Sequence, residues 1–572
     1  MTVILQSVEL KKEFGDHEVL REVNLQIKTG ERIGLVGRNG AGKTTLANIL
    51  MKRIIPDSGS IIWDRQDIRI GYLVQSTFYT SVKMDQLFAE NQSSIQSFFK
   101  TTSQLGMEKS KAWGQEKFQG LSGGERTKMA LASLWSEAPE LLILDEPTNH
   151  LDFQGLQWLI REIHVFEGAV LIISHDRYFL DQTVERILEL EDGRILNYQG
   201  NYSFYQKEKK RRYQNQMHAY LKQEKQKRKI EEEIERLQKW SDKSHHGASK
   251  KAAKAGRKKG GKEHYRVKAK KKDKQVKSKL KRMEKIKVEG VKKPKEESRI
   301  QFAFEDGAKR GKRIIEAVEI AKSYPDKSLF GESSFIIQRG DRIGLFGENG
   351  CGKTTLIKAI LGEQKLDAGQ IRVSSSAQLA VMSQDVMDLP DQQTVLESFS
   401  VDSKKEEYEV RTLLANLGIN AGLIQNKIGQ LSLGERVRIK LAQVLLSPNN
   451  LLILDEPGNH LDLACREMLE ETLESYRGTI ILASHDRYML EKVCDQLLVF
   501  EAGKVKRLEC KLSTYLQEEE NRHKLKQEED RLILDHRLSC VLGELNRYRP
   551  DQAEYKRLEA EFDDLLSRRR AK

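Results

Sequence analysis

Two glycine-rich segments of this 572-residue chain have the composition and spacing of a phosphate-binding loop. GRNGAGKTT begins at Gly37, and GENGCGKTT begins at Gly347. Their glycines allow backbone N–H groups to curl around phosphate oxygens, and the positive end of the dipole of the following helix adds to the attraction. Lys43 and Lys353 are expected to reach the β- and γ-phosphates of a nucleotide. One such motif is weak evidence for nucleotide binding, whereas two in one chain are strong evidence.

Carboxylates end an apolar segment in each half of the chain. LLILDEP occupies residues 141–147 and again 451–457. Its aspartates, Asp145 and Asp455, are placed to hold Mg²⁺ directly or through water, and the loop threonines that follow the lysines should add a hydroxyl. The next residues, Glu146 and Glu456, are placed to orient or deprotonate an attacking water. A helix N-cap is the alternative role for these acids, and the two matching sets make it the less favoured one.

The elements that must position these residues belong to a tandem duplication. The loops, LLILDEP, LSGGE at 121–125 with LSLGE at 431–435, and SHDRY at 174–178 with 484–488 all recur at an offset of 310 residues. ERIGLVGRNGAGKTTLANIL predicts a strand, a glycine turn and a helix, and ELLILDEP and AVLIISHD are typical of buried parallel strands. Each copy is therefore predicted to be α/β, with its function at the carboxyl ends of the strands.

LSGGE and LSLGE resemble the signature motif of the ATP-binding cassette superfamily, and the resemblance covers nearly all of both copies. It implies that the signature of each cassette completes the ATP site of the other, so that ATP joins the two halves and hydrolysis releases them. The resemblance pairs one loop, Gly37–Thr44, with Ser432 and Gly434. It pairs the other loop, Gly347–Thr354, with Ser122, Gly123 and Gly124.

The resemblance also assigns roles to side chains outside these motifs. Gln75 and Gln384 resemble the glutamine that senses metal and water, and His175 and His485 resemble the switch histidine on the γ-phosphate. NHLD at 149–152 and 459–462 resembles the D-loop. Phe14 and Tyr324 lie where the family stacks an aromatic ring on adenine, with a place in the hydrophobic core as the alternative.

The expected catalytic residues are Glu146, Glu456, His175 and His485. The residues expected at ATP are Phe14, Gly37, Asn39, Gly40, Gly42, Lys43, Thr44, Thr45, Gln75, Ser122, Gly123, Gly124, Tyr324, Gly347, Asn349, Gly350, Gly352, Lys353, Thr354, Thr355, Gln384, Ser432 and Gly434. Those expected at Mg²⁺ are Thr44, Gln75, Asp145, Thr354, Gln384 and Asp455. In the second copy Leu433 replaces Gly123 and Gly458 replaces Thr148. Both glutamates and both histidines remain, so both sites are expected to hydrolyse ATP, at rates that need not be equal.

The segment between the copies is strongly basic. Residues 206–299 contain 36 Lys+Arg and 13 Asp+Glu, a balance of +23, while the rest of the chain has a balance of −10. This asymmetry favours a polyanionic partner, with a solvated charged linker as the alternative. Apolar residues at helical spacing predict two antiparallel helices, at about 205–240 and 264–290, around a tip near 241–264. His245 and His246 lie in this tip, and Tyr265 follows it directly. The seam residues are Ile230, Ile234, Leu237, Val276, Leu280, Met283 and Ile286.

Tandem cassettes with EPTNHLD and a basic linker resemble the ABC-F family, which acts on ribosomes. The tip is long, and the 32 residues from Lys43 to Gln75 leave no room for the arm of the housekeeping members. The resemblance is therefore to the antibiotic-resistance type, the Vga/VmlR-like group. It implies binding to 23S rRNA and the P-site tRNA, and displacement of a lincosamide, pleuromutilin or streptogramin A by a tip directed toward the peptidyl-transferase centre.

Three other functions stay open from the sequence: an ABC-F translation factor without drug specificity, the ATPase subunit of an exporter, and a DNA-associated cassette ATPase. The chain has no window of about 18 apolar residues and no secretory signal, and its five cysteines form no CxxC motif. We expect a reduced, cytoplasmic monomer that has no membrane contact.

Heptad-like spacing predicts a helical hairpin after residue 516, either a ribosomal RNA contact or a docking or dimer-forming coiled coil. Its apolar positions are Leu534, Leu538, Val541, Leu545, Tyr548, Tyr555, Leu558, Phe562 and Leu565. The expected domains are residues 1–204, 205–299, 300–515 and 516–572.

Overall fold

The computed structural model describes residues 2–15, 17–65, 67–73, 123–136, 139–148, 151, 153–254, 271, 274–284, 286, 291, 293, 312–325, 327–382, 389–419, 421–447, 449–459, 461–545 and 553–571.

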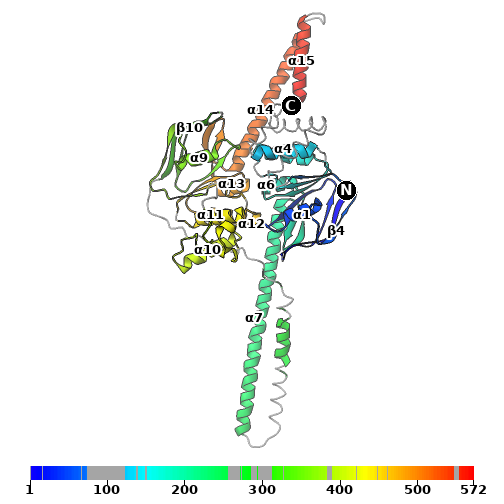
Figure 1. The fold of residues 1–572 in the computed structure, drawn as a ribbon, viewed down its shortest axis with the longest axis vertical. Coiled ribbons are helices and arrows are strands. Elements are labelled where there is room, and N and C mark those ends of the chain that lie inside the picture. Colours follow the sequence, from blue (N-terminus) through cyan, green and yellow to red (C-terminus); the bar gives the residue numbers. More distant parts are fainter. Residues whose placement is uncertain are drawn as a thin grey trace.

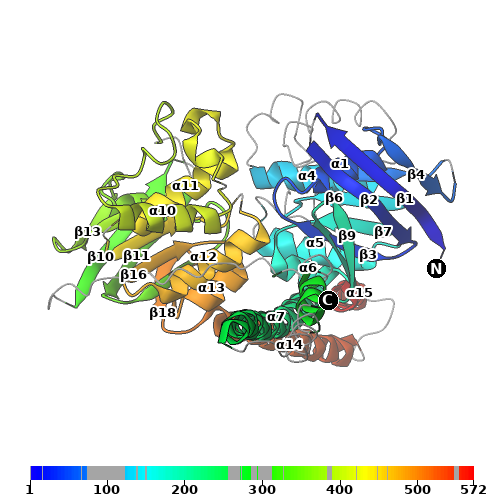
Figure 2. The same ribbon diagram turned by 90° about the horizontal axis from the view of Figure 1, so that it is seen from below.

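Two α/β domains lie side by side, and long helices project from them in opposite directions (Figure 1). The linker helix α7 points one way, and the C-terminal helices α14 and α15 point the other way. Seen along these helices, the two domains face each other across the elements α5, α6, α12 and α13 (Figure 2). The expected fold class, two tandem α/β cassettes with a P-loop in each, is confirmed. None of the helices in the described ranges is long and apolar enough to cross a membrane.

The first cassette combines a three-stranded antiparallel sheet, in the order β2-β1-β4, with a six-stranded sheet in the order β5-β6-β7-β3-β8-β9. The second sheet is parallel except for the β8–β9 pair. The elements are β1 Val3–Phe14, β2 His17–Lys28, β3 Arg32–Gly37, α1 Lys43–Leu50, β4 Ser58–Trp63, β5 Ile70–Leu73, α4 Gly123–Ser136, β6 Leu141–Asp145, α5 Phe153–Val165, β7 Ala169–Ile173, α6 Arg177–Thr183, β8 Arg186–Glu191 and β9 Arg194–Gln199.

The second cassette repeats this topology, with sheets in the orders β11-β10-β13 and β14-β15-β16-β12-β17-β18. Its elements are β10 Arg313–Tyr324, β11 Lys327–Gln338, β12 Arg342–Phe346, α9 Lys353–Ile360, β13 Ala368–Val373, β14 Leu379–Met382, α10 Lys404–Asn416, the 3₁₀ turns Leu423–Gln425 and Ile428–Gln430, α11 Leu433–Leu446, β15 Leu451–Asp455, α12 Leu463–Ser475, β16 Thr479–Ala483, α13 Arg487–Val493, β17 Gln496–Glu501 and β18 Lys504–Leu508.

The central strands are continuously apolar because they are covered on both faces. All residues of β6 and β7 are buried. Side chains alternate along a strand, so Leu141 and Ile143 join the core formed with α1 and the antiparallel sheet. Leu142 and Leu144 join the core formed with α5 and α6. The layers leave the carboxyl ends of β3, β6 and β7 as the open edge at which polar residues gather.

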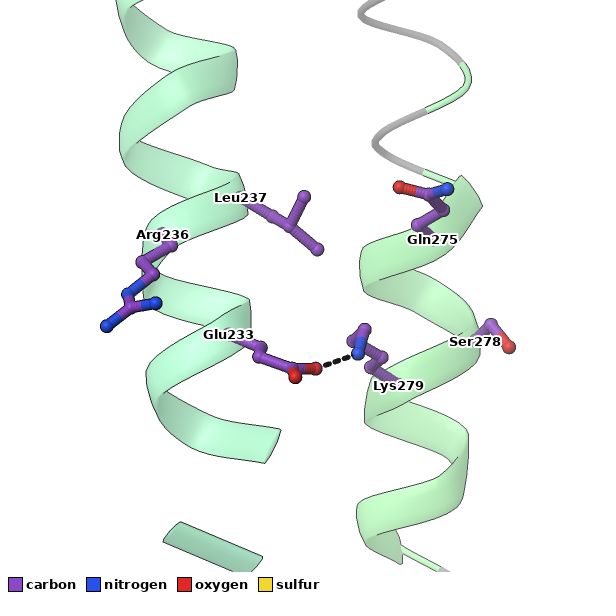
Figure 3. A pocket seen from close by; sticks show the side chains of 6 residues that line it. All are labelled: Glu233, Arg236, Leu237, Gln275, Ser278 and Lys279. Atoms are coloured by element: carbon purple, nitrogen blue, oxygen red, sulfur yellow. Dashed lines mark hydrogen bonds and ion pairs between the residues drawn. The ribbon is translucent and has the colours of Figure 1, made fainter. Parts of the chain in front are cut away.

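The linker begins with α7, Tyr202–Lys254, whose 53 residues give a length of about 80 Å. The helix expected to end near residue 240 therefore continues to Lys254, so the first part of the expected tip is helical. Residues 274–284 form a helix that packs on α7 through Ile230, Ile234 and Val276. Met283, Ile286 and Leu237 flank this seam, and Glu233 forms an ion pair with Lys279 across it (Figure 3).

Leu280 was expected in this seam and is instead 36% exposed, because the narrow seam is filled by its neighbours one turn away. The side chains of His245, His246 and Tyr265 lie outside the described residues.

The C-terminal extension forms two helices, α14 Leu512–Leu545 and α15 Ala553–Ala571. They pack on each other through the buried Leu538, Val541 and Leu565. Leu534, Leu545, Leu558 and Phe562 flank these residues. Tyr548 and the side chain of Tyr555 lie outside the described residues.

Candidate active site

Each P-loop lies between a strand and a helix, after β3 before α1 and after β12 before α9. Gly42 and Gly352 precede the two helices with φ values of 102° and 110°. This left-handed conformation suits glycine, which has no Cβ to clash. At Gly42 a Cβ would lie 2.5 Å from Cγ1 of Val19. The glycines therefore allow the loop to turn tightly over the end of its helix.

The P-loop lysines bend back over their own loops. Nζ of Lys43 donates to the carbonyl oxygens of Gly37 at 2.8 Å and Arg38 at 3.0 Å. Nζ of Lys353 makes the equivalent two bonds at 2.8 and 3.1 Å. Burial lowers the pKa of Lys43, and the carboxylates of Glu146 and its neighbours oppose that effect. Both ammonium groups are thus held within the concave loop that is expected to receive phosphate.

A hydroxyl and a carboxylate meet at the base of each loop. Oγ1 of Thr44 donates to Oδ2 of Asp145 at 2.9 Å, and Oγ1 of Thr354 donates to Oδ2 of Asp455 at 2.8 Å. Burial raises the pKa of both aspartates. No group of three or more His, Cys, Asp or Glu side chains is placed to hold a metal in the described ranges. One hydroxyl and one carboxylate fit Mg²⁺, which usually keeps waters and substrate phosphates as its other ligands.

Glu146 and Glu456 follow these aspartates in an unusual backbone conformation. Both have φ of 52°, a left-handed value that is uncommon for a residue with a side chain and that often marks a functional position. Their N–H groups donate to the carbonyl oxygens of Ile173 and Ala483, at 2.8 and 2.9 Å. Oε1 of each glutamate is buried and has no hydrogen-bond partner among the described residues. A buried acceptor left unpaired is costly, so these oxygens fit a role that is completed by water or substrate.

The two histidines that resemble the switch histidine lie against these glutamates. Nε2 of His175 is 3.7 Å from Oε1 of Glu146, and Nε2 of His485 is 3.5 Å from Oε1 of Glu456. Burial raises the pKa of Glu146 to about 7 and that of Glu456 to about 8. Burial lowers the pKa of His175 well below its ordinary value. A neutral imidazole and a weakly acidic carboxyl are suited to proton exchange with a water near pH 7.

The second P-loop faces the first cassette across a cavity of about 550 Å³. Lining residues from the second cassette include Lys353, Thr354, Thr355, Asp455, Glu456 and His485. Those from the first cassette include Thr148, Leu151, Phe153 and Asp176. Both cassettes therefore contribute to this cavity, and its first-cassette residues come from the D-loop region and the segment after β7.

At the first P-loop the second cassette makes direct polar contacts. Oδ2 of Asp462, in the D-loop, accepts the N–H of Asn39 at 3.1 Å. Arg466 donates to the carbonyl oxygen of His175 at 3.0 Å. The side chain of His175 is 9% exposed, compared with 37% for His485. The two sites thus share a plan but differ in how closely the opposite cassette covers the histidine.

Some expected ATP contacts stay predictions. Phe14 and Tyr324 are 50% and 47% exposed, which excludes the hydrophobic core as their place, and Tyr324 lines the cavity. Ser432 caps α11, where its side chain and Glu435 form a reciprocal capping box. Gln75, Gln384 and Ser122 lie outside the described residues, and Gly123 and Gly124 begin α4.

No role was predicted from the sequence for two arginines at the interface. The guanidinium of Arg487 lies 4.2 Å from the ring centre of Phe153 and 3.9 Å from that of Tyr178. Arg487 belongs to the SHDRY motif, so its recurrence was a usable signal. Arg466 lies in none of the recurring motifs. The sequence marks it only by a difference between the copies, since Leu156 stands at the equivalent position of the first cassette.

Comparison with known proteins places this site in a family. Models described as ABC transporter match residues 20–149, 330–459 and 188–304. The ribosome protection protein VmlR of Bacillus subtilis (strain 168) is 38% identical over 571 residues, 99% of this chain and 98% of that protein. The energy-dependent translational throttle protein EttA of Escherichia coli (strain K12) is 31% identical over 87% of this chain and 92% of its own.

The fold agrees with this placement. A solved structure of RNase-L inhibitor has a TM-score of 0.57 at 20% identity and covers 88% of this chain and 89% of its own. The matched cassette segments contain both P-loops and both pairs of strand-end carboxylates, so the protein is an ATPase that binds ATP. The chain belongs to the ABC-F family of ATP-binding cassette ATPases, in the group that contains VmlR.

Proposed function

We propose that this ATPase binds the ribosome and protects it from antibiotics that act at the peptidyl-transferase centre. The observation that carries the proposal is the similarity to the ribosome protection protein VmlR over 99% of the chain, which includes the linker. In the proposed cycle ATP holds the cassettes together, the linker tip is directed toward the peptidyl-transferase centre and the drug is displaced. Hydrolysis then releases the protein into the cytoplasm.

The ATP sites would use the residues that recur in both cassettes. Lys43 and Lys353 bind the phosphates from within their loops. Glu146 and Glu456 orient the attacking water and accept its proton. Mg²⁺ held at the threonine–aspartate pairs would offset the negative charge of the phosphates. The signature residues Ser122, Gly123, Gly124, Ser432 and Gly434 would close each site from the opposite cassette, and the other predicted residues at ATP and Mg²⁺, Gln75 and Gln384 among them, keep their proposed roles.

The linker supports a ribosomal RNA partner through its charge and its reach. Exposed basic side chains continue along α7 and its packing partner, among them Lys222, Lys225, Lys274, Lys277 and Lys281. RNA phosphates attract such side chains in a salt-dependent manner. A helix of about 80 Å carries them well beyond the cassettes (Figure 1). The proposed contacts are 23S rRNA and the P-site tRNA, made by one copy of the protein.

The test is translation in vitro with a lincosamide, a pleuromutilin or a streptogramin A. The wild-type protein is expected to restore synthesis of a reporter in the presence of at least one of these drugs. The variant Lys43→Ala/Lys353→Ala, which loses the phosphate-binding lysines, is the matched control and is expected to give no rescue. Failure of the wild-type protein to rescue with any of the three drugs would reject the proposal.

A second candidate is an ABC-F translation factor without drug specificity, which the 31% identity to the translational throttle protein EttA favours. The same assay separates the two, because a general factor should change drug-free translation and should leave drug inhibition unaltered.

A further inference from the structure

Helix α12 of the second cassette contacts the first cassette through residues 463–470. Its first residue, Leu463, belongs to the core that contains α5 and α6. Arg466 donates to the carbonyl oxygen of His175 at 3.0 Å. Glu470 forms a buried ion pair with Arg177, with one hydrogen bond of 3.1 Å. The helix therefore lies directly against the switch histidine of the first ATP site.

The same helix also contacts the base of the linker. Oε1 of Glu467 accepts hydrogen bonds from the hydroxyl of Tyr202 at 3.0 Å and from Nε2 of Gln206 at 2.9 Å. Tyr202 is the first residue of α7 and is 2% exposed. A buried hydroxyl needs an acceptor, and here the second cassette supplies it. Arg466 and Glu467, which are adjacent, thus contact an ATP site and the linker helix.

The first cassette anchors the linker base independently. Asp181 of α6 accepts the N–H of Ser203 at 2.7 Å and its hydroxyl at 2.9 Å. Oε1 of Glu189 accepts the hydroxyl of Tyr205 at 2.7 Å. The hydroxyl of Tyr488, from the second cassette, lies 3.4 Å from Oδ2 of Asp181. The start of α7 is therefore fixed to one cassette and contacted by the other, so a change in their separation acts on it directly.

The residues that form this bridge at the linker do not recur in the other copy. The start of α14 is the counterpart of the start of α7, and Ser513 is held there by Glu491 at 2.9 Å, as Ser203 is held by Asp181. At the 310-residue offset Leu512 and Leu516 replace Tyr202 and Gln206, and Gln157 stands in place of Glu467. Leucine side chains cannot donate the two hydrogen bonds that Tyr202 and Gln206 donate at the linker. The anchor is therefore common to both copies, whereas the cross-cassette contact occurs at the linker.

We propose that α12 couples the nucleotide state of the first ATP site to the orientation of the linker helix, with Glu467 as the positioning residue. A shift of His175 toward a bound γ-phosphate displaces its carbonyl and hence Arg466, and Glu467 passes the displacement to Tyr202 and Gln206. The use of this coupling on the ribosome rests on the proposed function. The coupling itself is a property of the free protein and is measured there.

The test is the distance between α7 and the second cassette, measured by pulsed electron paramagnetic resonance on the Glu146→Gln/Glu456→Gln protein without ribosomes. Spin labels at Lys225 and at Tyr408, which is 72% exposed, are attached through keto amino acids because the chain has native cysteines. ATP is expected to narrow and shift the distance distribution. In a Glu467→Ala background the ATP-dependent distribution is expected to be about two-fold broader, because α7 no longer follows the second cassette.

Four controls make the result decisive. A second label pair, Tyr408 with Val165, which is 79% exposed, reports joining of the cassettes and is expected to respond to ATP as before. Glu467→Gln keeps an acceptor oxygen and is expected to recover most of the narrowing, and Tyr202→Phe is expected to lose it. Glu474→Ala, on the same helix with a 58% exposed side chain, is expected to behave as the parent.

Two outcomes would overturn the inference. One is that Glu467→Ala leaves the distribution of distances between α7 and the second cassette unchanged while the cassettes still join. The other is loss of joining in Glu467→Ala, since the contact would then serve the interface as a whole. Intact coupling in a protein that does not bind ribosomes would instead refute the proposed function and leave the inference standing.

Discussion

Replacement of Glu470 by isoleucine tests how the two cassettes are held together. Arg177 of the first cassette lies against Glu470 and also 3.2 Å from Asp486. Isoleucine is a natural choice, because Ile160 occupies the equivalent position in the first cassette. The change removes one charge of a buried pair and leaves Glu146 and Glu456, the proposed catalytic residues, in place.

The structure sets the size of the effect. The side chains of Arg177 and Glu470 are 3% and 2% exposed, and loss of one partner of such a pair costs about 3–5 kcal/mol. Since Asp486 stays close to the guanidinium, we expect a cost at the lower end of this range, about 3 kcal/mol. Separation of the cassettes would return Arg177 to water, so the cost is expected to appear in the open–joined equilibrium. At about 1.4 kcal/mol per factor of ten, the equilibrium population of the joined state falls by up to about 100-fold.

Steady-state ATP hydrolysis measures this shift. Because ATP must recruit a rarer joined state, KM is expected to rise by up to about 100-fold, while kcat at saturating ATP stays within about three-fold. The double variant Arg177→Leu/Glu470→Ile removes both charges of the pair. Asp486 then retains Arg466 as an ion-pair partner, at 3.6 Å. The KM of this double variant is expected to return to within about ten-fold of wild type.

An unchanged KM in Glu470→Ile would contradict this prediction, since the Arg177–Glu470 pair would then not stabilise the joined state. The prediction also fails if the double variant is as impaired as the single one, because the penalty could not be assigned to an unpaired buried charge.

Three further predictions concern charge. Because burial raises the pKa of Glu146 to about 7 and that of Glu456 to about 8, and only the carboxylate accepts a proton, kcat/KM for ATP is expected to fall as the pH is lowered through 8 and 7; a flat profile would contradict this. Both folded-state pKa values lie above the ordinary 4.5, so deprotonation destabilises the fold as the pH rises from there. Glu146→Gln/Glu456→Gln should therefore raise Tm at pH 8, and the gain should vanish near pH 4. Replacing Lys274, Lys277 and Lys281 with glutamine should weaken ribosome binding and reduce its salt dependence, by about 0.7 in slope for each RNA phosphate that the variant no longer neutralises.

The arrangement of the residues proposed to bind ATP could be predicted from the sequence, because this chemistry fixes both residue type and spacing. A loop lysine, a hydroxyl and a strand-end carboxylate can meet only if the strand, turn and helix are short and regular, and Thr44 and Asp145 do meet, at 2.9 Å. The duplication then gave each residue a second occurrence. The linker seam was predictable for a similar reason, since Ile230 and Ile234 repeat at helical spacing and are buried.

The contacts that Arg466 and Glu467 make between the cassettes were not predictable, because they join residues far apart in the chain and break the repeat. Arg466 and the carbonyl of His175 are 291 positions apart, and no periodicity connects them. Glu467 and Tyr202 have no chemical counterpart in the other copy. The extent of α7 also escaped prediction, since the polar residues after 240 continue a helix that no apolar pattern marks.

The central claim is that ATP, by joining the two cassettes, directs the basic linker into ribosomal RNA. It is tested most directly by sedimenting Glu146→Gln/Glu456→Gln with ribosomes in the presence and absence of ATP at moderate salt. We expect the protein to sediment with the ribosome only when ATP is present. A protein that remains free of ribosomes with ATP bound would contradict it.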